Sequence, residues 1–176
     1  MKVNKILKAA AIILLPLLLV SCAGTESASP LAYQSRSAEM ELCGEMRGVT
    51  YAATLSLGAI PAGGTRDIRL EFSEPEVLRG VCIVREGGVW GARAGEISFS
   101  GDAAQKLGLP AEAFELDGEV TFSGMSEDKF ALFSVACADG CTAQIRQNGE
   151  TPVSIVLTFP DGGKLTANVT SYTPRD

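Results

Sequence analysis

The sequence has 176 residues and no histidine, and its 15 lysines and arginines stand against 21 aspartates and glutamates, a net charge of −6. The acidic balance excludes a nucleic-acid-binding module, whose footprint is a basic face. The absence of histidine excludes Ser-His-Asp and Cys-His catalysis and histidine-ligated zinc. No motif supplies another catalytic or metal-binding constellation, so we expect a protein that is not an enzyme and uses no cofactor.

Residues 1–21 are typical of an export signal peptide, with three lysines before the apolar run 9–20. A run of about twelve residues is too short for a bilayer core, which needs roughly twenty. The junction Leu19-Val20-Ser21-Cys22 resembles the lipobox of bacterial lipoproteins, in which the cysteine is acylated after cleavage of the signal. The resemblance implies an extracytoplasmic protein anchored through Cys22 to the cell membrane, or to the outer membrane in a Gram-negative envelope.

Residues 22–37 are mostly small and polar and show no apolar period. This composition predicts a flexible tether with a root-mean-square reach of roughly 20 Å. Residues 38–176 then form a single β-rich domain, because their number suits one hydrophobic core.

Short runs of alternating apolar and polar residues, separated by glycines, predict an antiparallel sheet. The expected strands are 40–46, 49–57, 68–73, 80–86, 89–93, 96–100, 130–137, 141–147, 152–159 and 164–172. A turn at Arg47-Gly48 pairs Leu42 with Ala53 and Met40 with Leu55, which puts both apolar sets on one face.

A helical pattern lies between Asp102 and Leu116, with Ser100 or Asp102 as the expected cap and Pro110 in the first turn of a second short helix. The predicted fold class is therefore α+β, mainly β: a curved antiparallel sheet, an incomplete barrel, with a short helical insert over one face.

Four cysteines follow Cys22, and an even number in an oxidising compartment predicts two disulfides. A hairpin turn at 138–140 places Cys137 opposite Cys141, Val135 opposite Ala143 and Phe133 opposite Ile145, all on one face of the sheet. This register favours a bridge between Cys137 and Cys141. The other pair, Cys43 and Cys82, would lie about 14 Å apart in a simple meander, beyond the reach of a disulfide. Either the strand order is not a meander or both of these thiols are free.

The order of elements carries a second resemblance, based on Pro-Glu-x-Leu-x-Gly at 75–80, Gly87-Gly88, the helical region and Thr-Pro-x-x-Ile at 151–155. Over about residues 40–172 the chain resembles small Gram-positive envelope lipoproteins whose domain is similar to the outer-membrane lipoprotein carrier and receptor proteins. The resemblance implies a half-barrel lidded by helices, whose apolar hollow takes up acyl chains. This sequence departs from that pattern in its shorter, more polar lid, which contains Glu112, Glu115 and Asp117, and in its four extra cysteines.

A curved sheet with one apolar face needs a cover, and any uncovered part of that face is a site for an apolar ligand. We therefore predict that lipid or lipoprotein acyl chains bind to residues that line this face: Tyr51, Leu55, Ile68, Leu70, Phe72, Phe133, Val135, Ile145, Ile155 and Leu157. The same residues would form an ordinary core in the alternative function, an anchored interaction or assembly module of the cell envelope with no small-molecule ligand. An apolar hollow favours the first function, and a filled core with an exposed patch favours the second.

Overall fold

The computed structural model describes residues 29–62 and 64–175. The export signal, the lipobox and Cys22 lie outside the described residues. Within the described part, no helix is both long enough and apolar enough to cross a membrane.

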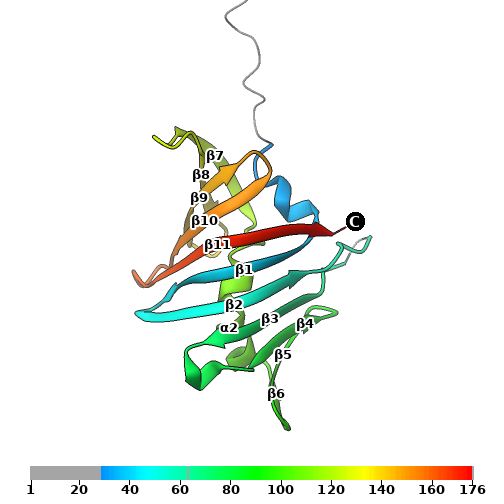
Figure 1. Cartoon of the computed structure of the whole chain (residues 1–176). Helices are drawn as coiled ribbons and strands as arrows, with labels where there is room; N and C mark the ends of the chain where they lie inside the picture. Colours follow the sequence, from blue (N-terminus) through cyan, green and yellow to red (C-terminus); the bar gives the residue numbers. More distant parts are fainter. Residues whose placement is uncertain (1–28, 63, 176) are drawn as a thin grey trace, which may run out of the picture.

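Eleven strands of the described chain form one antiparallel sheet (Figure 1). The strands are β1 (Ser37–Met46), β2 (Val49–Leu57), β3 (Ile68–Glu74), β4 (Cys82–Glu86), β5 (Val89–Ala94), β6 (Ile97–Ser100), β7 (Gly118–Met125), β8 (Ala131–Cys137), β9 (Thr142–Asn148), β10 (Thr151–Thr158) and β11 (Lys164–Arg175). The helices are α2 (Asp102–Glu112) and the short 3₁₀ turns η2 (Ala32–Ser35) and η3 (Glu76–Leu78). The sheet is not closed into a barrel, and one α-helix accompanies it in the described chain, so the predicted fold class is confirmed.

The predicted register of the first hairpin is confirmed, since Met46 pairs with Val49, Leu42 with Ala53 and Met40 with Leu55. In the β8–β9 hairpin, Phe133 pairs with Ile145 and Val135 with Ala143, also as predicted. The strand β7 was not predicted. Its sequence does alternate Val120 and Phe122 with polar residues, but the flanking glycines obscured a strand of ordinary length.

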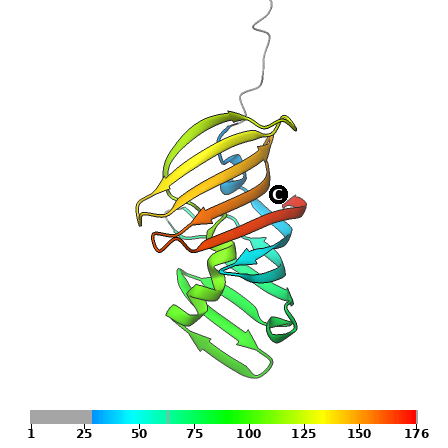
Figure 2. The ribbon, with the colours of Figure 1, turned by 90° about the vertical axis from the view of Figure 1, so that its left-hand side faces the viewer.

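The strand order β6-β5-β4-β3-β2-β1-β11-β10-β9-β8-β7 explains why the sheet is curved. Its two outer strands, β6 and β7, follow one another in the chain and are joined through α2. In a flat sheet ten strand spacings would separate them by roughly 48 Å. The 17 residues between them span at most roughly 37 Å when 11 are helical. The sheet must bend, and α2 must cross the face inside the bend, as Figure 2 shows.

The helical region differs in detail from the prediction. It is one helix, and Pro110 lies in its last turn rather than opening a second helix. Neither Ser100 nor Asp102 caps it, because the N-cap position is Gly101, with φ 87° and no side-chain hydrogen bond. After the helix the chain turns through Phe114, whose N–H donates to the Ala111 carbonyl at 3.0 Å, so no residues remain for a second helix.

Part of the predicted tether belongs to the folded domain. Leu31 and Tyr33 are buried, and η2, which contains Tyr33, contacts β10. The aromatic ring of Tyr33 packs edge-on against Phe114, with centroids 6.2 Å apart. The structured chain therefore begins before residue 38, because these two apolar side chains complete the core.

Candidate functional site

The ten predicted lining residues share one face of the sheet, as expected, but this face is not an open hollow. Each of the ten is at most 4% exposed. The cover consists of α2, which contacts β3, β4, β5, β6 and β11, and of η2 over β10. Under this cover the predicted acyl-binding residues form the hydrophobic core of the domain.

The contact between α2 and β5 depends on a glycine. A Cβ atom at Gly108 would lie only 2.5 Å from Cζ3 of Trp90, so no larger residue fits without a shift of the ring. The Trp90 ring also receives the Arg85 guanidinium, 5.3 Å from the ring centroid. Trp90 is thus packed between helix and sheet and is buried.

A buried ionic cluster, which we call the arginine cluster, lies beside α2 and consists of Arg66, Arg85 and Glu115. Nε of Arg66 is 2.9 Å from one Glu115 carboxylate oxygen, and Nη2 of Arg85 contacts the other. Arg66 is only 2% exposed, and burial lowers the pKa of its guanidinium while the Glu115 carboxylate opposes that shift. Because isolated buried charges are costly, Glu115 fixes the segment after α2 against the sheet.

The backbone connections of the arginine cluster extend this anchoring. Arg85 donates from Nη2 to the Arg66 carbonyl at 3.2 Å, and Arg66 donates from Nη1 to the Arg36 carbonyl at 3.2 Å. The cluster therefore joins β4, the β2–β3 loop, the segment after α2 and the residue before β1. Sequence reasoning did not find it. Arg85 lies two residues after Ile83 on β4, and this spacing could have assigned it to the inner face, but nothing in the loop marks Arg66.

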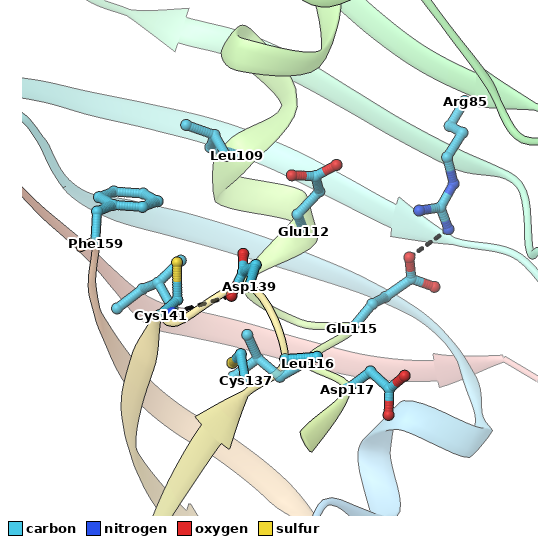
Figure 3. Close-up of a pocket in the computed structure, with 12 residues that line it drawn as sticks. Arg85, Leu109, Glu112, Glu115, Leu116, Asp117, Cys137, Asp139, Cys141 and Phe159 are labelled. Atoms are coloured by element: carbon cyan, nitrogen blue, oxygen red, sulfur yellow. Dashed lines mark hydrogen bonds and ion pairs between the residues drawn. The ribbon is translucent and has the colours of Figure 1, made fainter. Parts of the chain in front are cut away.

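Two hollows flank the segment Glu115–Asp117 of the chain. The first, the α2 pocket, has a volume of about 320 Å³ and extends toward the β8–β9 turn (Figure 3). The second, the η2 groove, has a volume of about 500 Å³ and lies between η2, the β2–β3 loop and β7. Both contain carboxylates, and of the ten predicted lining residues only Leu157 lines the α2 pocket and none lines the η2 groove.

The carboxylates of the α2 pocket differ in their surroundings. Burial raises the pKa of Glu112, whose carboxylate accepts a hydrogen bond from Nε2 of Gln105 at 3.1 Å. Asp139 instead accepts a hydrogen bond from the Cys141 N–H at 3.0 Å, which lowers its pKa. A pocket with these charges is a poor match for an alkyl chain.

The β8–β9 turn brings Cys137 and Cys141 together as predicted, with the Cys137 N–H donating to the Cys141 carbonyl at 3.0 Å. The structure has both thiols free, so the bridge between them stays a prediction. Burial raises the pKa of Cys141 to about 11, and the hydrogen bond with Asp139 adds to this shift. Burial also raises the pKa of Cys137. Neither thiol is therefore an activated nucleophile at neutral pH.

The possible pairing of Cys43 with Cys82 is corrected by the strand order. The first four strands do form a meander, with β2 and β3 between the strands that carry these cysteines. Three strand spacings amount to about 14 Å, well beyond disulfide reach. Both thiols are free.

At the outer strand β7 the inner face of the sheet is not covered. Val120, Phe122 and Met125, which we call the β7 patch, pair with Val135, Phe133 and Ala131 and therefore lie on the inner face of the sheet. A bulge between Phe122 and Gly124 keeps Met125 on this face. Phe122 and Met125 are each 58% exposed. The β7 patch is thus an apolar strip along a sheet edge with which no other strand of residues 29–62 and 64–175 pairs.

Among residues 29–62 and 64–175 there is no group of three or more histidine, cysteine, aspartate or glutamate side chains placed to hold a metal ion.

Comparison with protein-family models found none that matches the sequence. No curated protein matches it either.

Several solved structures share the architecture. One is an uncharacterized conserved protein from Thermus thermophilus, with 11% identity and a TM-score of 0.54 over 86% of this chain and 89% of that one. Another is MucB, with 14% identity and a TM-score of 0.51 over 87% of this chain. The chain spans 60% of the MucB structure, and MucB has also been solved as a Pseudomonas aeruginosa MucA/MucB complex.

The matches include a LolA superfamily protein from Nitrosomonas europaea, with 10% identity and a TM-score of 0.43 over 85% of this chain and 94% of that one. This likeness is loose, and membership of the lipoprotein-carrier family stays a prediction. At such identities a shared fold does not fix a shared function. What the comparisons establish is that this chain has the curved-sheet fold of the Thermus thermophilus protein and of MucB.

Proposed function

We propose that this chain is a lipid-anchored extracytoplasmic binding protein that holds a protein partner at the β7 edge of its sheet. The proposal includes no catalytic activity. The anchor and the location follow from the signal and lipobox at residues 1–22, and the partner follows from the surface of the folded domain. The single observation that carries the proposal is the exposed apolar β7 patch on an open edge.

Apart from its bulge after Phe122, the β7 edge lacks the features that normally prevent strand addition. Natural edge strands are protected by charged residues, prolines or short length. β7 has eight residues, no proline and a single charge, at Glu119. Its outer N–H and C=O groups and the apolar side chains beside them match a partner strand with apolar residues at alternate positions. The fold is shared with MucB, which has been solved with MucA, so a protein partner is compatible with this architecture.

Site-specific photo-crosslinking in cells tests the partner. A benzoylphenylalanine at position 122 should give a discrete, larger adduct because Phe122 lies at the proposed contact. The matched control is position 89, where Val89 is 66% exposed on the distant β4–β5 turn. Adducts of equal yield at both positions, or none at position 122, would contradict the proposal.

Acyl-chain binding to the inner face is the second candidate function. What favours it is the continuity of the apolar face: the ten predicted residues do lie together, beneath a cover made of one helix and one short turn. An acyl chain could reach them only if α2 or η2 moved. Titration of the delipidated protein with a fluorescent fatty acid tests this, with Leu70→Glu expected to reduce binding far more than Arg69→Glu on the opposite face.

The anchor has its own test. Cys22→Ser removes the acceptor of the lipid, so we expect the variant to leave the membrane fraction on carbonate washing while its circular dichroism matches that of the wild type. Retention of the variant in the washed membranes would show that the lipobox interpretation is wrong.

A further inference from the structure

The segment Ser29–Arg36 is held as a peptide ligand would be. The surface that it covers, which we call the η2 seat, has Gln147 of β9 at its base, Phe114 on the α2 side and Glu150 at the rim. Leu31 and Tyr33 bury their side chains there, and Tyr33 meets Phe114 edge-on. The Arg36 guanidinium forms an ion pair with the Glu150 carboxylate.

Gln147 binds the backbone of this segment. Its side chain is fully buried, its Oε1 accepts from the Leu31 N–H at 3.3 Å, and its Nε2 donates to the Ser29 carbonyl at 3.1 Å. Nε2 also donates to the Gly149 carbonyl. One amide side chain thus satisfies both a donor and an acceptor of the segment's backbone, as a neighbouring strand would.

The chemistry of Gln147 restricts what could replace the segment. If residues 29–36 leave, Gln147 loses one acceptor and one donor, and an unpaired buried amide is costly. An alkyl chain offers neither group, whereas another peptide offers both. The η2 seat therefore suits a peptide better than a lipid.

The chain's own segment fits the seat imperfectly. The Tyr33 hydroxyl and the Gln34 amide nitrogen are buried without a hydrogen-bond partner in the described chain, and Leu31 has a φ of 55°, in the left-handed region that a leucine rarely adopts. Each of these features weakens the hold of the segment. The η2 groove beside it is lined by Leu31 and Gln34 on one side and by Val120 of the β7 patch on another.

We infer that the η2 seat is a peptide-binding site, filled in the free protein by Ser29–Arg36 and taken by a segment of the protein partner on binding. The inference rests on the proposed function and names the partner's chemistry. The incoming segment supplies a carbonyl and an N–H two residues apart to Gln147, an aromatic residue at the place of Tyr33 and a basic residue opposite Glu150. Its continuation passes along the η2 groove to the β7 patch.

The test uses a fluorescent peptide of sequence Ser-Pro-Leu-Ala-Tyr-Gln-Ser-Arg and the full-length protein in detergent. In the wild type the internal segment competes at a high effective concentration. Tyr33→Ala weakens that competitor, so the peptide should bind this variant at least ~10-fold more tightly than the wild type. Adding Gln147→Leu should abolish the binding. A peptide with alanine in place of tyrosine is the matched control and should not bind.

A second variant covers the case in which Tyr33→Ala fails to fold, as judged by circular dichroism. Arg36→Ala removes a half-exposed ion pair and leaves the core intact, and it should tighten peptide binding about threefold. Side-chain amide resonances of Gln147 should shift on peptide addition. Absence of binding in every folded variant, or binding that Gln147→Leu leaves unchanged, would overturn the inference. If the position-122 adduct still forms in that case, the proposed function stands and only the η2 seat is rejected.

Discussion

Phe72 of β3 and Phe122 of β7 lie on the same face of one sheet, yet the first is 1% exposed and the second 58%. Both come from strands with ordinary two-residue alternation, so periodicity assigns both rings to the inner face. What separates them is the path of α2, which packs on β3 and leaves the β7 patch uncovered. The α2-covered region forms the hydrophobic core, and the β7 end is exposed to solvent. The alternation of a strand tells which face a residue joins, while the connection between strands decides whether that face is covered.

Truncation of each ring to alanine tests whether Phe72 is packed and Phe122 is not. Phe72→Ala should lower the free energy of unfolding by about 3–5 kcal/mol, as for other buried aromatic residues. Phe122→Ala should cost less than about 1 kcal/mol, because more than half of the ring is already in water. Denaturant unfolding with an unchanged m-value measures both. Similar losses would show that the β7 end is packed in solution.

Loss of the carboxylate in the arginine cluster should destabilise the protein nearly as much as Phe72→Ala. Glu115→Ala leaves two buried guanidinium groups without a counter-charge, so we expect a loss of about 3–5 kcal/mol. The matched control is Glu127→Ala in the exposed β7–β8 turn, which should change stability by less than about 0.5 kcal/mol. Thermal unfolding of the two variants compares them directly, and equal melting temperatures would rule out a structural role for the cluster.

A side chain added where α2 approaches β5 should lower the stability by a smaller amount. Gly108→Ala pushes the Trp90 ring aside, at a cost of about 1–3 kcal/mol. Since alanine gains roughly 1 kcal/mol in helix propensity, we expect a net loss of stability of up to about 2 kcal/mol. Gly91→Ala on β5 is the control, since its Cβ would lie 3.6 Å from Val84 Cγ2, an ordinary contact. The near-ultraviolet circular dichroism of Trp90 should change only in the first variant.

At the β7 end, the predicted Cys137–Cys141 bridge would close a loop of five residues and contribute at most about 2 kcal/mol. Peptide mapping without reductant should recover the two cysteines in one linked fragment from protein isolated under oxidising conditions. Alkylation of both thiols in the folded protein would instead show that they are free, as they are in the structure. Reduction should loosen this hairpin and leave the α2-covered region unchanged.

The smallest expected change in stability comes from the ionisation of Glu112. Burial raises the pKa of its carboxyl group in the folded state, so the folded protein binds the proton more tightly than the unfolded chain does. The resulting stabilisation is complete below the unfolded pKa of about 4.3 and is lost as the pH rises through the folded pKa. Glu112→Gln should therefore be slightly more stable than the wild type at pH 7 and not at pH 4. Unfolding curves at the two pH values test this, and an equal difference at both would contradict it.

The sequence was sufficient to predict the register of those hairpins in which the apolar residues of both strands must lie on one face. Leu42 opposite Ala53 and Val135 opposite Ala143 followed from parity alone. It was not sufficient for β7, whose glycines at both ends resemble turns, nor for η2, where only Leu31 and Tyr33 interrupt a polar stretch.

The candidate site shows the same limit. The ten lining residues were placed correctly on one face, but their cover depends on α2 crossing from one sheet edge to the other, and a strand list does not give that order. Gln147 could have been found, because Ala143, Ile145 and Gln147 alternate on β9 and the last must face inward. Arg66 and Glu115 are 49 residues apart and meet only in the folded chain.

Native mass spectrometry of the intact protein, purified in mild detergent, tests most directly the claim that the inner face is filled by the protein's own core. We expect a single species whose native mass is identical to the mass measured after denaturation. A heavier native species that loses the mass of a lipid on denaturation would contradict the account. It would show that the face beneath α2 holds a ligand.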